Sequence, residues 1–151
     1  MAMLRGMPDA ASPEIIARVS ESFEYWNDGE PQLMLQEYAE DGELDLSAVF
    51  TDMPVFRGHE GIREQIEVLW DTWEGVRMNS LEVFDVGSGR FVVEARWWGK
   101  GRRSGAEVDQ HIAWLYTTRE SDGKIVRSQL FPSVEAAMDF AKATESAARR
   151  G

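Results

Sequence analysis

Cysteine is absent from the 151-residue sequence, which excludes disulfide frameworks and thiolate chemistry. Histidine is scarce, and the two that occur show no metal-ligand spacing with the scattered acidic residues, so we expect no metal and no cofactor. No run of 18 apolar residues occurs and the N-terminus is too polar for a secretory signal, so we expect no membrane partner. A chain without cysteine fits a reducing compartment, and we predict a cytoplasmic protein.

Positive charge is also in short supply. Lys and Arg number 16 against 27 Asp and Glu, which gives a net charge of −11. Such a chain repels phosphate backbones, so we expect no nucleic-acid partner. The short basic run at residues 99–103 lies between two predicted strands and is typical of a solvated hairpin tip.

Aromatic residues, by contrast, are plentiful. They make up 11% of the chain, with six Trp, and hydrophobic residues make up 43%, which excludes general disorder. The length fits one domain of ordinary size. We expect a flexible leader over residues 1–12 and a single domain over residues 13–148.

Capping residues and the spacing of apolar residues predict four helices. Ser12 is a typical N-cap, Pro13 suits the first helical position, and Gly29 ends the run. Ser133 starts the last helix in the same way. The other two predicted helices cover residues 31–38 and 59–73.

Alternating segments predict five strands, which follow mostly after the helices. They cover residues 43–46, 78–86, 91–98, 106–116 and 124–131. Helices that precede a meander of antiparallel strands indicate an α+β fold in which the sheet packs on the helices.

Charged residues occupy every second position of two consecutive strands. If the hairpin centres on residues 102–103, Glu94 faces His111 and Arg96 faces Asp109, so that each acid meets a base. A slip of one residue would scatter this pattern. We therefore predict this register, with all four side chains on one face of the sheet.

A buried charged face is costly unless it walls a polar pocket. We therefore expect Arg96, Asp109 and His111 to converge on a cavity between the sheet and the first and third helices. The alternatives remain a hydrogen-bonded structural histidine and a cross-strand ion pair between Arg96 and Asp109. His59, at a helix start, is better explained by capping.

The opposite face is broad, aromatic and left without a predicted helix to cover it. The register that places Ala113 near Leu130 and Leu115 near Ser128 gives this face the following residues: Val93, Ala95, Trp97, Val108, Gln110, Ile112, Trp114, Tyr116, Arg127, Gln129 and Phe131. A large exposed apolar patch favours association. We predict a homodimer through Trp97, Trp114, Tyr116 and Phe131.

Five segments resemble the SnoaL-like family of the nuclear transport factor 2-like superfamily, over roughly residues 13–145. They are residues 25–30 (YWNDGE), 35–41 (LQEYAED), 56–62 (FRGHEGI), 96–101 (RWWGKG) and 122–126 (DGKIV). The resemblance implies a cone, in which a curved antiparallel sheet wraps around N-terminal helices and encloses a pocket, usually in a dimer. Family members include cyclases, isomerases, epoxide hydrolases, dehydratases and proteins without catalytic activity.

The catalytic patterns of two related enzyme classes are not preserved. Where ketosteroid isomerases have a Tyr and an Asp, this chain has Ser22 and Leu46, which argues against that activity, although Asp45 is adjacent. Arg96 matches the Arg of limonene epoxide hydrolases. Trp98 and roughly Leu130 stand in place of their acids.

The resemblance to SnoaL-type cyclases implies an acid/base Asp with a nearby His, which Asp109 and His111 could supply. The first hypothesis is a cofactor-independent cyclase, isomerase or dehydratase acting on a hydrophobic carbonyl compound, with Arg96 stabilising an oxyanion. The second is a non-catalytic ligand-binding or dimerisation module. Residues expected to contact the ligand, unless they only pack in the core, are Glu94, Trp98, Trp26, Tyr38, Trp70 and Leu130.

Overall fold

The helices lie where caps and apolar spacing predict them. In the computed structural model, which describes residues 9–145, the Ser12 hydroxyl accepts a hydrogen bond from the Ile15 amide at 3.3 Å, and Ser133 caps the last helix at Ala136. The helical segments are α1 (Pro13–Asn27), the 3-10 helix η2 (Pro31–Glu37), α2 (Gly58–Thr72) and α3 (Val134–Ala143).

Seven strands form one curved sheet in the order β1-β4-β5-β6-β7-β2-β3. Their bounds are β1 Asp9–Ala10, β2 Tyr38–Asp45, β3 Phe56–Arg57, β4 Trp73–Gly87, β5 Arg90–Gly101, β6 Glu107–Thr118 and β7 Ile125–Phe131. Neighbouring strands are antiparallel, except that β2 runs parallel to β7, so the sheet is mixed where an antiparallel one was predicted. The predicted α+β cone is confirmed.

Part of the predicted leader belongs to the sheet. Asp9 and Ala10 pair with β4, and the Ala11 amide donates to the Val83 carbonyl at 2.9 Å. The free backbone groups at the edge of β4 give this segment hydrogen-bond partners, which corrects the predicted leader at residues 9–11. Residues 1–8, and the last residues of the predicted domain, 146–148, lie outside the described part of the chain.

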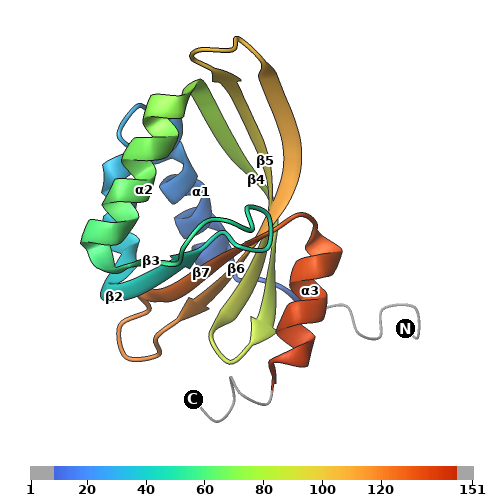
Figure 1. Cartoon of the computed structure of the whole chain (residues 1–151). Coiled ribbons are helices and arrows are strands. Elements are labelled where there is room, and N and C mark those ends of the chain that lie inside the picture. The colour runs from blue at the N-terminus through green and yellow to red at the C-terminus, as the bar shows by residue number, and fades with distance from the viewer. Residues whose placement is uncertain (1–8, 146–151) are drawn as a thin grey trace.

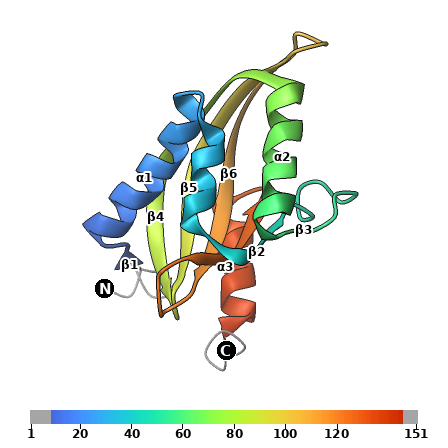
Figure 2. The same cartoon turned by 90° about the vertical axis from the view of Figure 1, so that its left-hand side faces the viewer.

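The helices lie on both faces of the sheet. Figure 1 shows α1 and α2 on one side and α3 on the other, and Figure 2 shows α1, η2 and α2 side by side on the first of these faces. We call the face under α1 and α2 the inner face and the face under α3 the outer face. On β5, Val93 belongs to the main core beneath α1 and α2, whereas Val92 belongs to a second core with α3.

The β5–β6 register differs from the predicted one by two residues. Arg96 faces His111 and Trp98 faces Asp109. The turn is longer than assumed: the Gly101 amide donates to the Ala106 carbonyl at 2.9 Å. A shift of two residues leaves every side chain on its predicted face. The charged side chains therefore share one face as predicted, but the predicted cross-strand pairs were wrong.

The β6–β7 register differs by one residue, and this exchanges the faces of β7. Leu115 pairs with Gln129, and Tyr116 pairs with Ser128. Ser128 and Leu130 therefore lie on the inner face, while Phe131 lies on the outer face. There the Phe131 ring packs against Phe140 of α3, with ring centroids 5.3 Å apart.

The two faces have the opposite surroundings from those predicted. The helices cover the aromatic face, because burying its large apolar area is the stronger driving force, and they leave the charged part of the other face to solvent. Trp97, Trp114 and Tyr116 thus lie inside the cone. They are not available as the predicted dimer surface, and Phe131 lies beneath α3.

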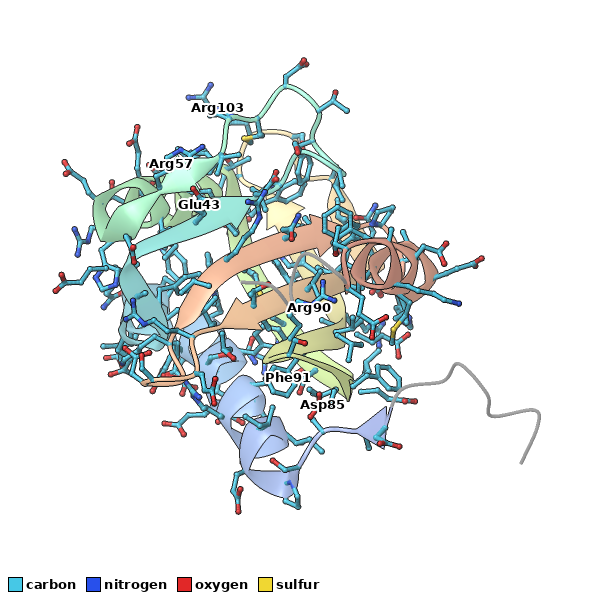
Figure 3. All side chains as sticks on the ribbon, turned by 90° about the horizontal axis from the view of Figure 1, so that it is seen from below. Glu43, Arg57, Asp85, Arg90, Phe91 and Arg103 are labelled. Carbon is cyan, nitrogen blue, oxygen red and sulfur yellow. The ribbon has the colours of Figure 1, made fainter. Side chains whose placement is uncertain are left out.

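Ion pairs join the strands at the β2 end of the sheet. Arg127 of β7 contacts Glu43 and Asp45 of β2, each at 3.2 Å. Arg57 of β3 also pairs with Glu43, and Figure 3 shows these two side chains together at the sheet edge. These contacts tie the parallel strand pair and its short neighbour together.

Candidate functional site

A cavity of about 280 Å³ lies between the inner face of the sheet, the helices and the loop at residues 46–55. Strand β6 contributes every second residue to its wall, as strand geometry requires. The lining residues from the sheet are Tyr38, Leu44, Met78, Trp97, Val108, Gln110, Ile112, Trp114, Tyr116, Leu130 and Trp73. Those from the helices and the loop include Phe23, Trp26, Met34, Ile62, Gln65, Ile66, Leu69, Leu46, Val49 and Phe50.

Aromatic rings form much of this wall. Trp114 and Tyr116 are parallel, with centroids 6.1 Å apart and an interplanar angle of 3°. Trp73 and Trp97 meet edge to face at 5.1 Å and 89°. Rigid, flat walls of this kind suit a flat, largely apolar ligand.

None of the described residues that line the cavity carries a side chain that is charged at neutral pH. Its polar groups are the amides of Gln65 and Gln110, the hydroxyls of Tyr38 and Tyr116, and the indole N–H groups of the lining tryptophans. Gln65 is buried, with 8% of its surface exposed. The cavity is therefore neutral, with few hydrogen-bonding groups.

The Tyr38 hydroxyl is hydrogen-bonded to the Ser128 hydroxyl at 2.8 Å. Burial raises the pKa of Tyr38 to about 12, although the bond to Ser128 acts in the opposite direction. Burial also raises the pKa of Tyr116 well above its usual value, and the neighbouring Tyr38 adds to this. Both phenols stay protonated at neutral pH and can donate hydrogen bonds.

Two indole groups next to the cavity have no hydrogen-bond acceptor within residues 9–145. They are the Nε1 atoms of Trp26 and Trp114. Buried donors without an acceptor are uncommon and costly. These two N–H groups are spare donors in an otherwise apolar region.

Arg96, Asp109 and His111 lie on the outer face and do not line the cavity, so their predicted convergence there was wrong. Arg96 holds Asp109 through two hydrogen bonds of 2.8 and 2.6 Å, with 53% and 43% of the two side chains exposed. The hydrogen bond from Arg96 is the main reason that the pKa of Asp109 is lowered. Because helices cover the inner face, the charged side chains meet solvent and form the ion pair that was the alternative.

The residues expected to contact a ligand divide between the faces. Trp26, Tyr38 and Leu130 line the cavity. Glu94 shares the outer face with Arg96. Trp98 lies on the same outer face and its ring approaches Gly75, while Trp70 packs against Trp26 with centroids 6.3 Å apart and is not among the lining residues.

His59 has a structural contact. Its Nε2 atom lies 2.8 Å from the Tyr38 carbonyl oxygen, which ties the start of α2 to β2. The hydrogen bond therefore goes to a neighbouring strand, in place of the capping contact expected at the helix start.

Gln65, Gln110 and Phe50 were missed as cavity residues. A signal existed for the first two: Gln65 interrupts the apolar stripe of α2, and Gln110 lies between Val108 and Ile112 on the aromatic face. Nothing in the local pattern marks Phe50, whose position depends on how the loop folds back. It lines the cavity and is 50% exposed, so it lies at the mouth.

The described residues contain no cluster of three potential metal ligands. No helix within the described part is both long and apolar enough to cross a membrane.

The model of the SnoaL-like domain matches residues 19–128. Among curated proteins, none matches the chain. A hypothetical protein of ketosteroid isomerase-like fold from Catenulispora acidiphila, solved with trimethylamine, is similar with a TM-score of 0.67 and 20% identity, over 82% of this chain and 88% of that one.

Two further solved structures share the fold. One, described as a SnoaL-like polyketide cyclase, is from Jannaschia sp. CCS1, with a TM-score of 0.64, 20% identity, and coverage of 85% and 93% of the two chains. The other is the epoxide hydrolase/cyclase-like enzyme SalBIII, with a TM-score of 0.63, 17% identity and coverage of 80% and 89%. At these identities the likeness shows a common fold.

Proposed function

Because the chain belongs to the SnoaL-like family, we propose that its cavity binds a neutral, largely apolar small molecule with a flat ring system. The observation that carries this proposal is the lining, which is aromatic and aliphatic with no charged side chain among the described residues. A charged ligand would lose its hydration there without gaining an ion pair, which is costly. A neutral ring system would lose only water from its surface.

The size of the cavity limits the ligand. At about 280 Å³ it lies just below the range of roughly 300–1,000 Å³ found for small-molecule pockets. The ligand is therefore small, and the half-exposed Phe50 lies where it would enter.

Binding can be tested with the neutral fluorescent probe N-phenyl-1-naphthylamine and a sulfonated naphthylamine of similar size. We expect the neutral probe to bind and the anionic probe to bind at least tenfold more weakly, because the cavity offers no counter-charge. Ile112→Trp should abolish binding, because it fills a lining position. Arg96→Met, on the outer face, is the control and should bind as wild type. Equal binding of both probes, or loss of binding in Arg96→Met, would contradict the proposal.

A second candidate function is cofactor-independent catalysis on a carbonyl compound, as a cyclase, isomerase or dehydratase. The Tyr38 hydroxyl favours it, because a protonated phenol in an apolar cavity can stabilise charge that develops on a carbonyl oxygen. Asp109 and His111 cannot move protons in the cavity from the outer face. In this reaction, solvent water would take the α-proton of an enolisable aryl ketone while Tyr38 donates a hydrogen bond to the carbonyl oxygen. Deuterium exchange at the α-carbon should be lost in Tyr38→Phe and kept in Asp109→Asn. Equal rates in Tyr38→Phe and wild type would exclude this role.

A further inference from the structure

Tyr116 lines the cavity and carries a hydroxyl that no group of the described chain engages. Its side chain is almost fully buried, with 6% of the residue exposed. No hydrogen bond to its hydroxyl occurs within residues 9–145, whereas Tyr38 has Ser128 and Tyr25 has Glu21 and Gln36. A hydroxyl at a cavity wall without a protein partner can still hydrogen-bond a molecule bound there.

Tyr116 lies beside two cavities and next to two other residues that carry hydroxyl groups. Tyr116 borders the main cavity and also a smaller one of about 40 Å³. It is the direct cross-strand neighbour of Ser128, which in turn holds Tyr38. Hydroxyl-bearing residues of β2, β6 and β7 are therefore neighbours in the sheet beside a cavity that is mostly apolar.

Of the three hydroxyls, only that of Tyr116 takes part in no hydrogen bond among residues 9–145. The Tyr38 and Ser128 hydroxyls share one hydrogen bond of 2.8 Å, and Ser128 has no exposed surface. An acceptor atom placed beside Tyr116 would complete its hydrogen bond without breaking the existing pair. A phenol that stays protonated selects an acceptor such as a carbonyl oxygen.

We propose that Tyr116 donates a hydrogen bond to a carbonyl oxygen of the bound ligand and thereby fixes the end at which that oxygen lies. This inference rests on the proposed function and narrows its ligand to a neutral aryl carbonyl compound. The Tyr38–Ser128 pair adjoins Tyr116 in the sheet, since Ser128 is the cross-strand partner of Tyr116.

The test compares 2-acetylnaphthalene with 2-isopropenylnaphthalene, which has the same shape but a CH₂ group in place of the oxygen. Affinities for both are measured by tryptophan fluorescence with wild type, Tyr116→Phe and Tyr25→Phe. The affinity ratio of ketone to alkene should fall by about three- to tenfold in Tyr116→Phe. Tyr25→Phe is the matched control, because it removes a phenol hydroxyl outside the cavity, and it should leave the ratio unchanged.

A ratio that is unchanged in Tyr116→Phe, with both probes bound, would overturn this inference and leave the proposed function standing. Failure of both probes to bind wild type would overturn the two together. Infrared spectroscopy of the ketone bound to wild type gives a second reading that needs no variant. Its carbonyl stretch should lie below its position in hexane, and an unshifted band would also overturn the inference.

Discussion

Hydroxyl groups determine much of the character of the cavity at the scale of single residues. The Tyr38–Ser128 hydrogen bond joins the parallel strands β2 and β7. Both residues are buried, so solvent water does not replace this bond. Loss of one partner leaves the other buried and unsatisfied, which costs more than the bond itself contributes.

Tyr38→Phe should therefore lower the free energy of unfolding by about 1–2 kcal/mol, because it strands the Ser128 hydroxyl. Urea unfolding followed by tryptophan fluorescence measures this. Tyr25→Phe is the comparison, because its hydroxyl bonds lie at the exposed surface, and a change within about 0.5 kcal/mol is expected there. Equal losses of unfolding free energy in the two variants would show that the buried bond to Ser128 stabilises the fold no more than the exposed bonds of Tyr25.

At the scale of the elements, α3 is held at its end by a buried arginine. Arg90 donates to the Ala141 carbonyl and to the Thr144 hydroxyl, each at 2.8 Å, and so satisfies groups that a helix end leaves unpaired. Figure 3 shows Arg90 on the sheet beside α3.

Arg90→Met should lower the free energy of unfolding by about 1–3 kcal/mol, because charged hydrogen bonds to the helix end are lost. Hydrogen exchange should also speed up in α3 relative to β6. The control is Arg63→Met, on the exposed face of α2, for which we expect no change. Undisturbed exchange in α3 of Arg90→Met would show that apolar packing alone holds the helix.

The ion pairs between β2 and β7 predict a dependence of stability on pH. Burial alone would raise the pKa of Asp45, but hydrogen bonds from Ser47 and the charge of Arg127 lower it overall. A carboxyl whose folded pKa is below its unfolded value of about 3.9 stabilises the fold above that pH, and this contribution disappears as the pH falls through the folded pKa.

Arg127→Met should therefore lose less stability than wild type between about pH 5 and pH 3, because one of the groups that lower the pKa of Asp45 is gone. Urea midpoints across this range give the measurement. Parallel pH curves for the two proteins would mean that Arg127 does not contribute to this dependence.

The elements show where sequence reasoning succeeds and where it stops. Caps such as Ser12 and Ser133 act locally, so helix starts could be predicted. The alternation of Asp109 and His111 placed them on one face, which depends only on strand geometry. Which face the helices cover depends on the total apolar area, and the length of the turn after Gly101 sets the register; both are properties of the assembled sheet. The cavity was therefore expected on the wrong face, and Gln65 and Gln110 were missed.

At the scale of the whole molecule, the net charge of −11 governs encounters with other polymers. We expect no salt-dependent retention of the protein on DNA or RNA at near-physiological ionic strength, because phosphate is repelled. Retention that falls as salt rises would contradict this.

The predicted homodimer remains a prediction to be checked by sedimentation at micromolar concentration. The substitution Trp114→Glu would not test it, because Trp114 lines the cavity and the change would act there.

Successive residues of strand β6 point alternately into the cavity on the inner face and into solvent on the outer face. Gln110 and Ile112 line the cavity, and Asp109 and His111 lie behind them in solvent. One codon inserted between His111 and Ile112, if the strand does not absorb it as a bulge, turns Asp109 and His111 to the inner face. A single inserted residue would thus carry an acid and a base into a cavity that is otherwise lined by neutral side chains.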